Sequence, residues 1–336
     1  MIAPRQAGPQ VWTGRDLAAR PDEWTWHLSD QQINELITAA KPLASEDGDP
    51  QIAVADFPLP TMAAELAALR KRLLHGCGFE LLREFPAAEM TEAENAAVFL
   101  GLGAHLGSTR SQNAAGDLLG HVRDVGLDID DPNVRIYQTN ERQTFHTDST
   151  DVVGLMCLQT AASGGQSMLV SAAAIFNEML DRAPALVARM FEPVATDRRG
   201  EIPPGHKPYF EIPIFNWFDN VLTVIYQRQY IDSAQRFEGV APLDAEMTAA
   251  LDLFDEIAND PDMHLGMDLE VGDMQFVHNH GLLHDRTGFV NKPDAPRHLL
   301  RLWLSIAGDR ELPPSFAQRY GSIEVGNRGG IVARSA

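Results

Sequence analysis

A series of strand-like runs between residues 134 and 306 constrains the fold of this chain more than any other feature. The runs are rich in β-branched, aromatic and aliphatic residues, and turn signals separate them. Helical spacing comes before these runs and between some of them. This order is typical of an α+β domain built on an antiparallel barrel or double sheet. The clearest runs are residues 134–138, 152–158, 166–170, 221–226, 269–277 and 298–306.

The first third of the chain has helical spacing instead. Ser29 offers a cap before an apolar period that starts at residue 31. Thr91 and Glu94 have the spacing of a capping box, so we expect a helix from there to about residue 106. These helices look like an addition to the strand-rich core, not a domain that folds alone.

Two stretches lack a clear period. Residues 108–131 contain Gly, Asn and Asp and predict a long loop, which inside a compact domain is usually functional. Residues 193–220 are full of proline, glycine and aromatic residues and predict an insertion packed over the core. We therefore expect residues 1–60 to form an N-terminal arm and helix packed on the core. Residues 61–336 are expected to form a single domain that carries the insertion.

Composition is that of an ordinary globular protein, but the charge is strongly negative. Hydrophobic residues make up 44% and charged residues 22% of the chain. Lys and Arg number 27 against 47 Asp and Glu, so the formal net charge is −20. Because that charge repels polyanions, we expect no nucleic-acid partner and no membrane partner. A few arginines can still form a local positive pocket for a small anionic substrate.

Cysteine usage favours a reducing compartment. Cys77 and Cys157 form neither a disulfide framework nor a Cys-x-x-Cys motif. The first residues lack the apolar stretch of a signal peptide. No window approaches the roughly 20 apolar residues of a membrane helix. We therefore expect a cytoplasmic protein. The sequence does not decide whether the chain forms a homo-oligomer.

A His-x-Asp pair, His146 and Asp148, stands among β-type residues. In an extended strand the two side chains would share a face and present an imidazole nitrogen beside a carboxylate oxygen. These groups suit a divalent first-row metal, and one further histidine would complete the face that non-haem Fe(II) oxygenases use. Taken alone the pair is a weak signal, because such residues more often form a loop pair.

Three histidines compete for the third metal position. His278, His280 and His284 all lie near the end of one predicted strand. Periodicity does not choose among them. A histidine that is not a ligand would support the site from behind or form part of its wall.

Four segments carry motifs in a fixed order along the chain. They are Phe145-His146-Thr147-Asp148, Ser163-Gly164-Gly165-Gln166-Ser167, Gly272-Asp273-Met274-Gln275-Phe276 leading to His284-Asp285-Arg286-Thr287, and Arg297-His298-Leu299-Leu300-Arg301. Together they resemble the taurine dioxygenase/clavaminate synthase-like family of Fe(II)- and 2-oxoglutarate-dependent oxygenases. The match runs from about residue 70 to 308. It implies a double-stranded β-helix (jelly-roll) core with flanking helices and a helical N-terminal region.

The resemblance implies roles for individual residues. His146, Asp148 and His284 would be the metal ligands and the catalytic centre, since the family pattern selects the last of the three competing histidines. Iron(II) and the cosubstrate 2-oxoglutarate would bind there, with O2.

Three further residues would bind the cosubstrate. Arg297 would hold the distal carboxylate of 2-oxoglutarate, because a guanidinium fork meets a carboxylate with two hydrogen bonds. Ser167 would donate to the same carboxylate. Arg301 would lie near the proximal end of the cosubstrate or near the substrate.

The implied function is a dioxygenase that hydroxylates an unactivated C–H of a small molecule and releases succinate and CO2. Two alternatives stay open: another metal-dependent enzyme on the same barrel, such as a hydrolase or isomerase, and a non-catalytic binding module with a vestigial site. Arg142 or Arg228 would favour an amino-acid-, carboxylate- or sulfonate-like substrate if either faced the pocket. As surface ion-pair partners, which we prefer, they would not bear on the substrate.

Overall fold

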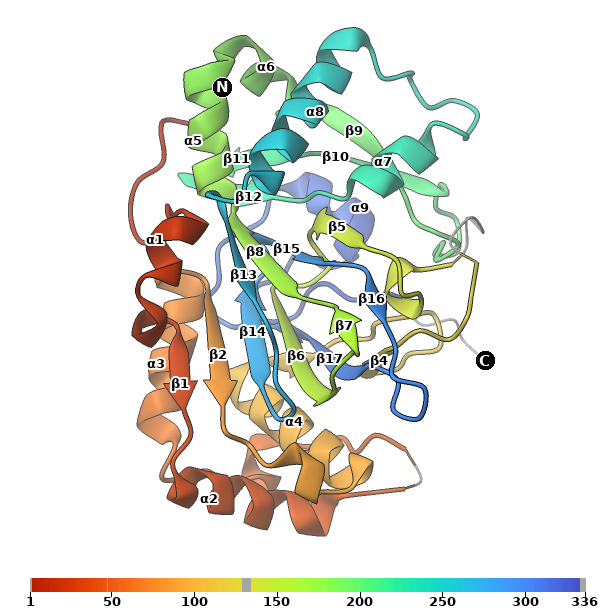
Figure 1. Ribbon diagram of the computed structural model, residues 1–336. Helices are drawn as coiled ribbons and strands as arrows, with labels where there is room; N and C mark the ends of the chain where they lie inside the picture. Colours follow the sequence, from red (N-terminus) through yellow and green to blue (C-terminus); the bar gives the residue numbers. More distant parts are fainter. Residues whose placement is uncertain (1, 47, 129–133, 333–336) are drawn as a thin grey trace.

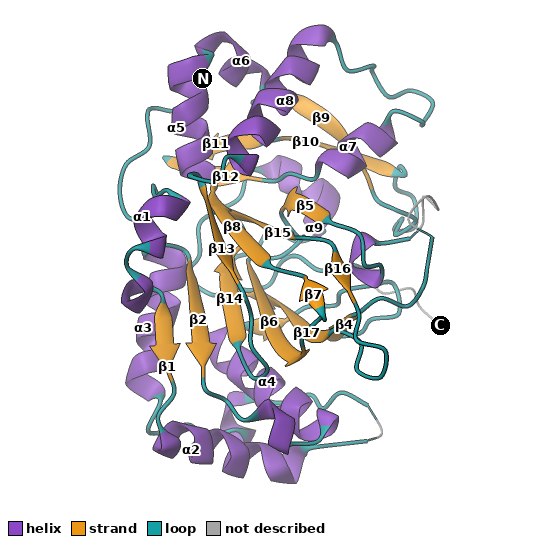
Figure 2. Cartoon of the chain, viewed as in Figure 1, coloured by secondary structure: helices purple, strands orange, loops and turns teal. Residues whose placement is uncertain are grey.

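Two β-sheets face one another in the computed structural model, which describes residues 2–46, 48–128 and 134–332 (Figures 1 and 2). The strands of the larger sheet are, in spatial order, β1 (Thr25–His27), β2 (Phe79–Arg83), β14 (Met274–His278), β6 (Val152–Gln159), β17 (His298–Ser305) and β3 (Ser108–Thr109). Strand β17 also pairs with β4 (Leu119–Val122). The smaller sheet contains β13 (His264–Met267), β8 (Ser167–Ser171), β15 (Leu282–Arg286) and β5 (Gln143–His146).

Helices cover the outer faces of both sheets (Figure 1). On the larger sheet lie α3 (Ala63–His75) and α4 (Glu92–Leu106), with α2 (Asp30–Ala40) packed on α4. On the smaller sheet lies α5 (Ala172–Arg182), followed by α6 (Pro184–Arg189) and α8 (Ala245–Asn259). The remaining helices are α1 (Gly14–Ala18), α7 (Arg228–Ala234) and α9 (Ala317–Tyr320).

Alternation along the strands of the larger sheet separates a helix-facing side from a cavity-facing side. Successive side chains of a strand point to opposite faces. In β17, Leu300 and Leu302 belong to the core under α4, whereas Arg301 and Trp303 line a cavity on the other side. The sheet therefore buries one face against helices and offers the other for chemistry.

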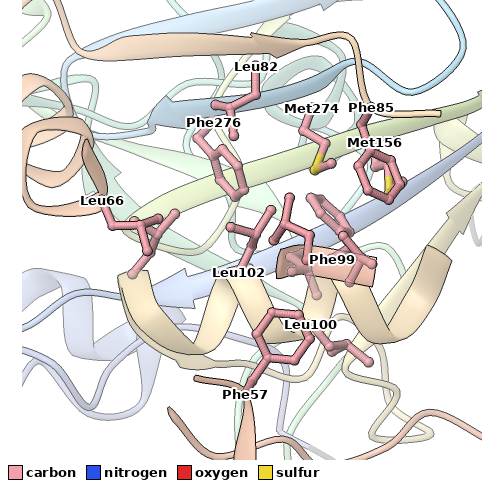
Figure 3. Packing of buried hydrophobic residues seen from close by; sticks show 14 of the residues in the cluster. Phe57, Leu66, Leu82, Phe85, Phe99, Leu100, Leu102, Met156, Met274 and Phe276 are labelled. Atoms are coloured by element: carbon pink, nitrogen blue, oxygen red, sulfur yellow. The ribbon is translucent and has the colours of Figure 1, made fainter. Parts of the chain in front are cut away.

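The core between α4 and the larger sheet contains closely packed aromatic rings (Figure 3). The ring of Phe99 on α4 lies 5.9 Å from that of Phe276 on β14, centroid to centroid. A Cβ at Gly154 of β6 would come 3.0 Å from Phe276 and 3.1 Å from Phe99. Glycine at this position therefore lets both rings reach the sheet.

A smaller apolar cluster fills part of the space between the two sheets. Phe79 and Leu81 of β2 meet Leu169 of β8 and Leu282 of β15 in this cluster. It fixes the distance between the sheets, and the cavities described below occupy the more polar part of the same space.

Both capping predictions agree with the structure. Ser29 caps α2 and Thr91 caps α4, and each forms a reciprocal capping box, with Gln32 and Glu94 respectively. Local side-chain chemistry therefore set these helix starts.

Three stretches differ from the prediction. Ile136–Gln138 is a 3-10 turn instead of a strand: the N–H of Gln138 donates to Arg135, that of Thr139 donates to Ile136, and no described strand pairs with the segment. The predicted loop 108–131 contains β3 and β4, which are too short to show alternation, and its residues 129–131 lie outside the described residues. The insertion 193–220 forms paired strands: β9 (Pro193–Asp197) with β10 (Tyr209–Pro213), and β11 (Phe215–Phe218) with β12 (Val221–Val224).

None of the helices in the described ranges is both long enough and apolar enough to cross a membrane. A last pair of short strands, β7 (Ser163–Gly164) and β16 (Phe289–Val290), lies beside the cavities.

Replacing Phe99 by alanine should destabilise the protein strongly. The ring is fully buried between α4 and the sheet, and such truncations cost about 3–5 kcal/mol. Urea unfolding would measure the loss. Val290→Ala is the control, since that side chain is 61% exposed. Equal stability of the two variants would show that the α4 core contributes less than its burial implies.

Candidate metal centre

Three side chains from neighbouring parts of the smaller sheet converge between the sheets. His146 ends β5, Asp148 follows it, and His284 stands in the middle of β15. The antiparallel pairing of β5 with β15 places His284 opposite His146, with ring centroids 4.1 Å apart. One ligand atom from each of the three lies within 4.8 Å of the other two. The structure thus brings together the three predicted metal ligands.

Hydrogen bonds leave one nitrogen of His146 available to a metal. Nδ1 lies 2.9 Å from the carbonyl oxygen of Thr144, and only a protonated nitrogen can donate to it. Nε2 is therefore unprotonated, and it accepts from the side-chain amide of Gln143 at 2.8 Å. Metal-binding histidines commonly have their tautomer fixed in this way.

Asp148 is held through both its carboxylate and its backbone. Oδ2 accepts from the indole Nε1 of Trp303 at 2.9 Å and from Nη1 of Arg301 at 3.4 Å. Asn279 accepts from the N–H of Asp148 at 2.8 Å and donates to the carbonyl oxygens of Asp148 and Thr150. These bonds fix the loop after β5 against the end of β14.

The electrostatics of the three groups fit a divalent cation. Burial lowers the pKa of His284 to about 3, with help from His146, and burial also lowers the pKa of His146. Burial alone would raise the pKa of Asp148, but Arg301 holds that pKa well below its usual range. At neutral pH the set is two neutral imidazoles and one carboxylate, which are the donors that non-haem Fe(II) takes.

A cavity beside these side chains has a buried guanidinium, that of Arg297, at its wall. Arg297 is 5% exposed and stacks on the ring of Phe289 at 5.2 Å. Within the described residues its Nη1 is buried without a hydrogen-bond partner. Burial lowers the pKa of Arg297 to about 10, so the group stays charged at neutral pH. A buried cation of this kind favours an anionic ligand.

Ser167 and Arg301, the other two predicted cosubstrate residues, line the same cavity as Arg297. The hydroxyl of Ser167 donates to Gln275 at 3.3 Å. Arg301 donates to Gln112 at 2.7 Å through Nε, and its Nη2 is buried without a partner among the described residues.

A second cavity adjoins the first. Arg135 and Arg319 line it, and they share one carboxylate: Glu201 lies 3.0 Å from Arg135 and 3.8 Å from Arg319. The half-buried side chain of Tyr230 also lines this cavity. The two cavities meet at side chains that line both: Tyr137, Gln143, His146 and Arg301.

Sequence reasoning missed four of the residues that shape these cavities and the metal centre, whereas Tyr230 belongs to a segment, residues 226–230, that it named as a plausible part of the pocket. Gln143 and Asn279 stand close to predicted ligands along the chain, so their position was a usable signal. The other two, Arg135 and Arg319, belong to none of the motifs, and only the fold brings them to the site.

Two arginines considered for the pocket form ion pairs instead. Arg142 binds Asp285 at 2.6 Å, and Arg228 lies between several aspartates. Neither side chain lines the two cavities. They therefore carry no information about the substrate.

His278 and His280 belong to a separate buried network. His280 lies 2.9 Å from Asp151, and His278 lies 3.0 Å from Asp309. Arg328 donates to both carboxylates, at 2.6 and 3.1 Å. This guanidinium already balances the carboxylates, and the network ties the C-terminal segment to the end of β14.

Comparison with known proteins gives one family. Residues 40–303 match the family model described as "Taurine catabolism dioxygenase TauD, TfdA family". FR-33289 synthase of Streptomyces rubellomurinus is 34% identical over 326 residues, which cover 94% of this chain and 94% of that protein. The taurine hydroxylase-like protein SAT17 of Stachybotrys chartarum is 29% identical over 307 residues, 87% of this chain and 77% of that protein.

A solved structure shares the fold. Asparagine oxygenase in complex with Fe(II), 3-hydroxyasparagine and succinate aligns with a TM-score of 0.66 at 19% identity, over 84% of this chain and 93% of that one. The predicted fold, a sheet core of the oxygenase type with flanking helices, is confirmed by this similarity.

Replacing Asp151 by asparagine should destabilise the protein severely. It leaves Arg328, a fully buried guanidinium, with only part of its counter-charge, and breaking a buried pair typically costs about 3–5 kcal/mol. Urea unfolding at pH 7 would measure the effect. Asp181→Asn is the control, because its ion pair with Arg5 is exposed to solvent. A midpoint shift no larger than that of the control would contradict the structural role of the network.

Proposed function

The chain belongs to the TauD/TfdA family of taurine catabolism dioxygenases, and from this membership we propose how its residues hold iron, cosubstrate and substrate. The protein is a non-haem Fe(II)- and 2-oxoglutarate-dependent dioxygenase that acts on a small molecule. When bound, iron, 2-oxoglutarate and O2 supply the oxidation of a substrate C–H bond, with release of succinate and CO2. The protein supplies binding, orientation and a dry, charged environment.

His146, Asp148 and His284 hold the iron in this proposal. The observation that carries it is their convergence from β5 and β15, with His146 fixed in the tautomer that a metal requires. Trp303 and Arg301 keep the carboxylate of Asp148 oriented and ionised. Hydrogen bonds from residues around a metal site hold its ligands in place and adjust how strongly they bind the metal.

Arg297 holds the distal carboxylate of 2-oxoglutarate. It is charged, buried and stacked on Phe289, and it lies in the cavity that adjoins the proposed iron ligands. Ser167 reaches the same carboxylate by turning its hydroxyl away from Gln275. A hydrolase or isomerase on this barrel would have no use for such a dicarboxylate clamp, which argues against that alternative.

The second cavity takes the substrate, and its charge selects an acidic one. Arg135 and Arg319 share only Glu201, so the group carries an excess positive charge. Arg198 and Arg319 both lie against the ring of Phe210. Burial, followed by repulsion from Arg319, lowers the pKa of Arg198 to about 10. An anionic group on the substrate would relieve this repulsion and form charge-assisted hydrogen bonds.

The carboxylates that line this cavity are already engaged. Asp148 is a proposed iron ligand, and Asp197 binds Arg236 and Ser233. Neither is free to bind an ammonium group. The cavity therefore favours a carboxylate- or sulfonate-type end group, and the α-ammonium of an amino acid would have to bind through uncharged groups.

Arg297→Ala should weaken 2-oxoglutarate binding by about 10- to 100-fold, because a hydrogen bond to a charged group contributes about 1.5–3 kcal/mol. Iron affinity should change little. Anaerobic titration of Fe(II) and then of 2-oxoglutarate, followed by the visible charge-transfer band, would separate the two. Arg5→Ala, a surface change with the same loss of charge, is the control. Equal loss of iron and cosubstrate binding would refute the assigned role.

Arg319→Ala should raise the KM for an acidic substrate at least tenfold while leaving the affinity for 2-oxoglutarate within twofold. Succinate release across sulfonates, carboxylates, amino acids and their neutral amide analogues would identify the class. Arg319→Lys should recover part of the loss, since it keeps the charge but loses the fork. If neutral analogues react as well as the acids do, the proposed substrate anchor is wrong.

A further inference from the structure

A cluster of metal-binding side chains lies on the α4 side of the larger sheet. Glu92 begins α4, His121 stands in β4, and His298 is the first residue of β17. His298 directly follows Arg297, and consecutive strand residues point to opposite faces. Arg297 therefore faces the cosubstrate cavity while His298 faces Glu92.

Strand pairing brings the two histidines together. β4 and β17 are antiparallel, and His121 pairs with Leu300, two residues beyond His298. The two imidazoles are therefore diagonal neighbours on one face of the sheet. Nδ1 of His121 lies 2.9 Å from Nε2 of His298, and it lies 3.7 Å from a carboxylate oxygen of Glu92. One ligand atom from each of the three groups lies within 4.8 Å of the others.

We propose that Glu92, His121 and His298 bind a divalent ion of the zinc type, with water in the remaining position. Zinc accepts imidazole nitrogen and carboxylate oxygen at about 2.0–2.2 Å, which separates tetrahedral ligand atoms by about 3.3 Å. The observed separations of 2.9 and 3.7 Å lie on either side of that value. Binding needs the proton between the two imidazoles to move to the other nitrogen of the ring that carries it, which frees both facing nitrogens, together with small side-chain movements.

The surroundings favour a cation. Burial lowers the pKa of His298 to about 4, so its imidazole is neutral and can coordinate at pH 7. Asp49 accepts from the backbone of Leu119, and its charge acts on His121. Glu92 raises the pKa of His298, whereas the positive charge of Arg123 lowers it. Side chains of Glu92 and His121 are 58% and 35% exposed, so an ion can enter from solvent.

The occupied site would join α4, β4 and the start of β17. It lies on the opposite face of the sheet from the proposed iron ligands and needs none of them. The inference therefore stands apart from the proposed oxygenase function.

Equilibrium dialysis of the full-length, metal-free protein against Zn²⁺ tests the proposal. We expect His121→Ala to bind one equivalent fewer than the unaltered protein, and Glu92→Gln to bind the same ion at least tenfold more weakly. His27→Ala is the matched control, because His27 is an exposed histidine whose Nδ1 lies 2.9 Å from Glu84, far from the proposed ligands in the sequence. It should bind as many equivalents as the unaltered protein.

A second experiment uses a variant that lacks two of the proposed iron ligands, so that Zn²⁺ cannot bind at that centre. In His146→Ala/His284→Ala, one equivalent of Zn²⁺ should remain and should raise the unfolding temperature, and adding His121→Ala should abolish both effects. If His121→Ala lost no equivalent in either background, or if the Glu92→Gln affinity were unchanged, the site would be only a hydrogen-bonded histidine pair and the proposal would fail. Circular dichroism of each variant confirms that it is folded.

Discussion

The pairing of β5 with β15 is the constraint on which the rest of the site depends. It places His146 opposite His284, and the loop after β5, held by Asn279, carries Asp148 to the same point. Three donors from distant parts of the chain are thereby fixed before any metal arrives. Preorganisation of this kind lowers the cost of binding, because the groups do not have to be ordered at that moment.

Strand β17 couples the core to the chemistry. One face of the strand carries Leu300 and Leu302, which pack under α4. The other face carries Arg301 and Trp303, which donate hydrogen bonds to Asp148. Buried charge is costly unless it is paired. Here the hydrophobic face supplies the packing that keeps the charged face in place, and Nη1 of Arg297, which has no hydrogen-bond partner among the described residues, is left for a ligand.

The sequence predicted the family fold, the oxygenase class and its cofactors, and these are confirmed. Capping boxes and strand alternation were readable because they depend on residues close in the chain. The strand expected at residues 134–138 was wrong, since a strand needs a neighbour and periodicity does not reveal one. The roles assigned to His146, Asp148, His284, Ser167, Arg297 and Arg301 remain predictions, although the structure gathers all six at the two cavities or between them.

Arg135 and Arg319 could not have been found from the sequence, because neither belongs to a motif and their meeting is a product of the fold. Arg319 also lies beyond residue 303, where the match to the family ends, whereas the proposed iron ligands and Arg297 lie inside it. The wall of the proposed substrate cavity is thus partly built from a segment beyond the range that the family model matches. Substitutions in that segment can change which molecule is oxidised while the proposed iron ligands and Arg297 stay the same.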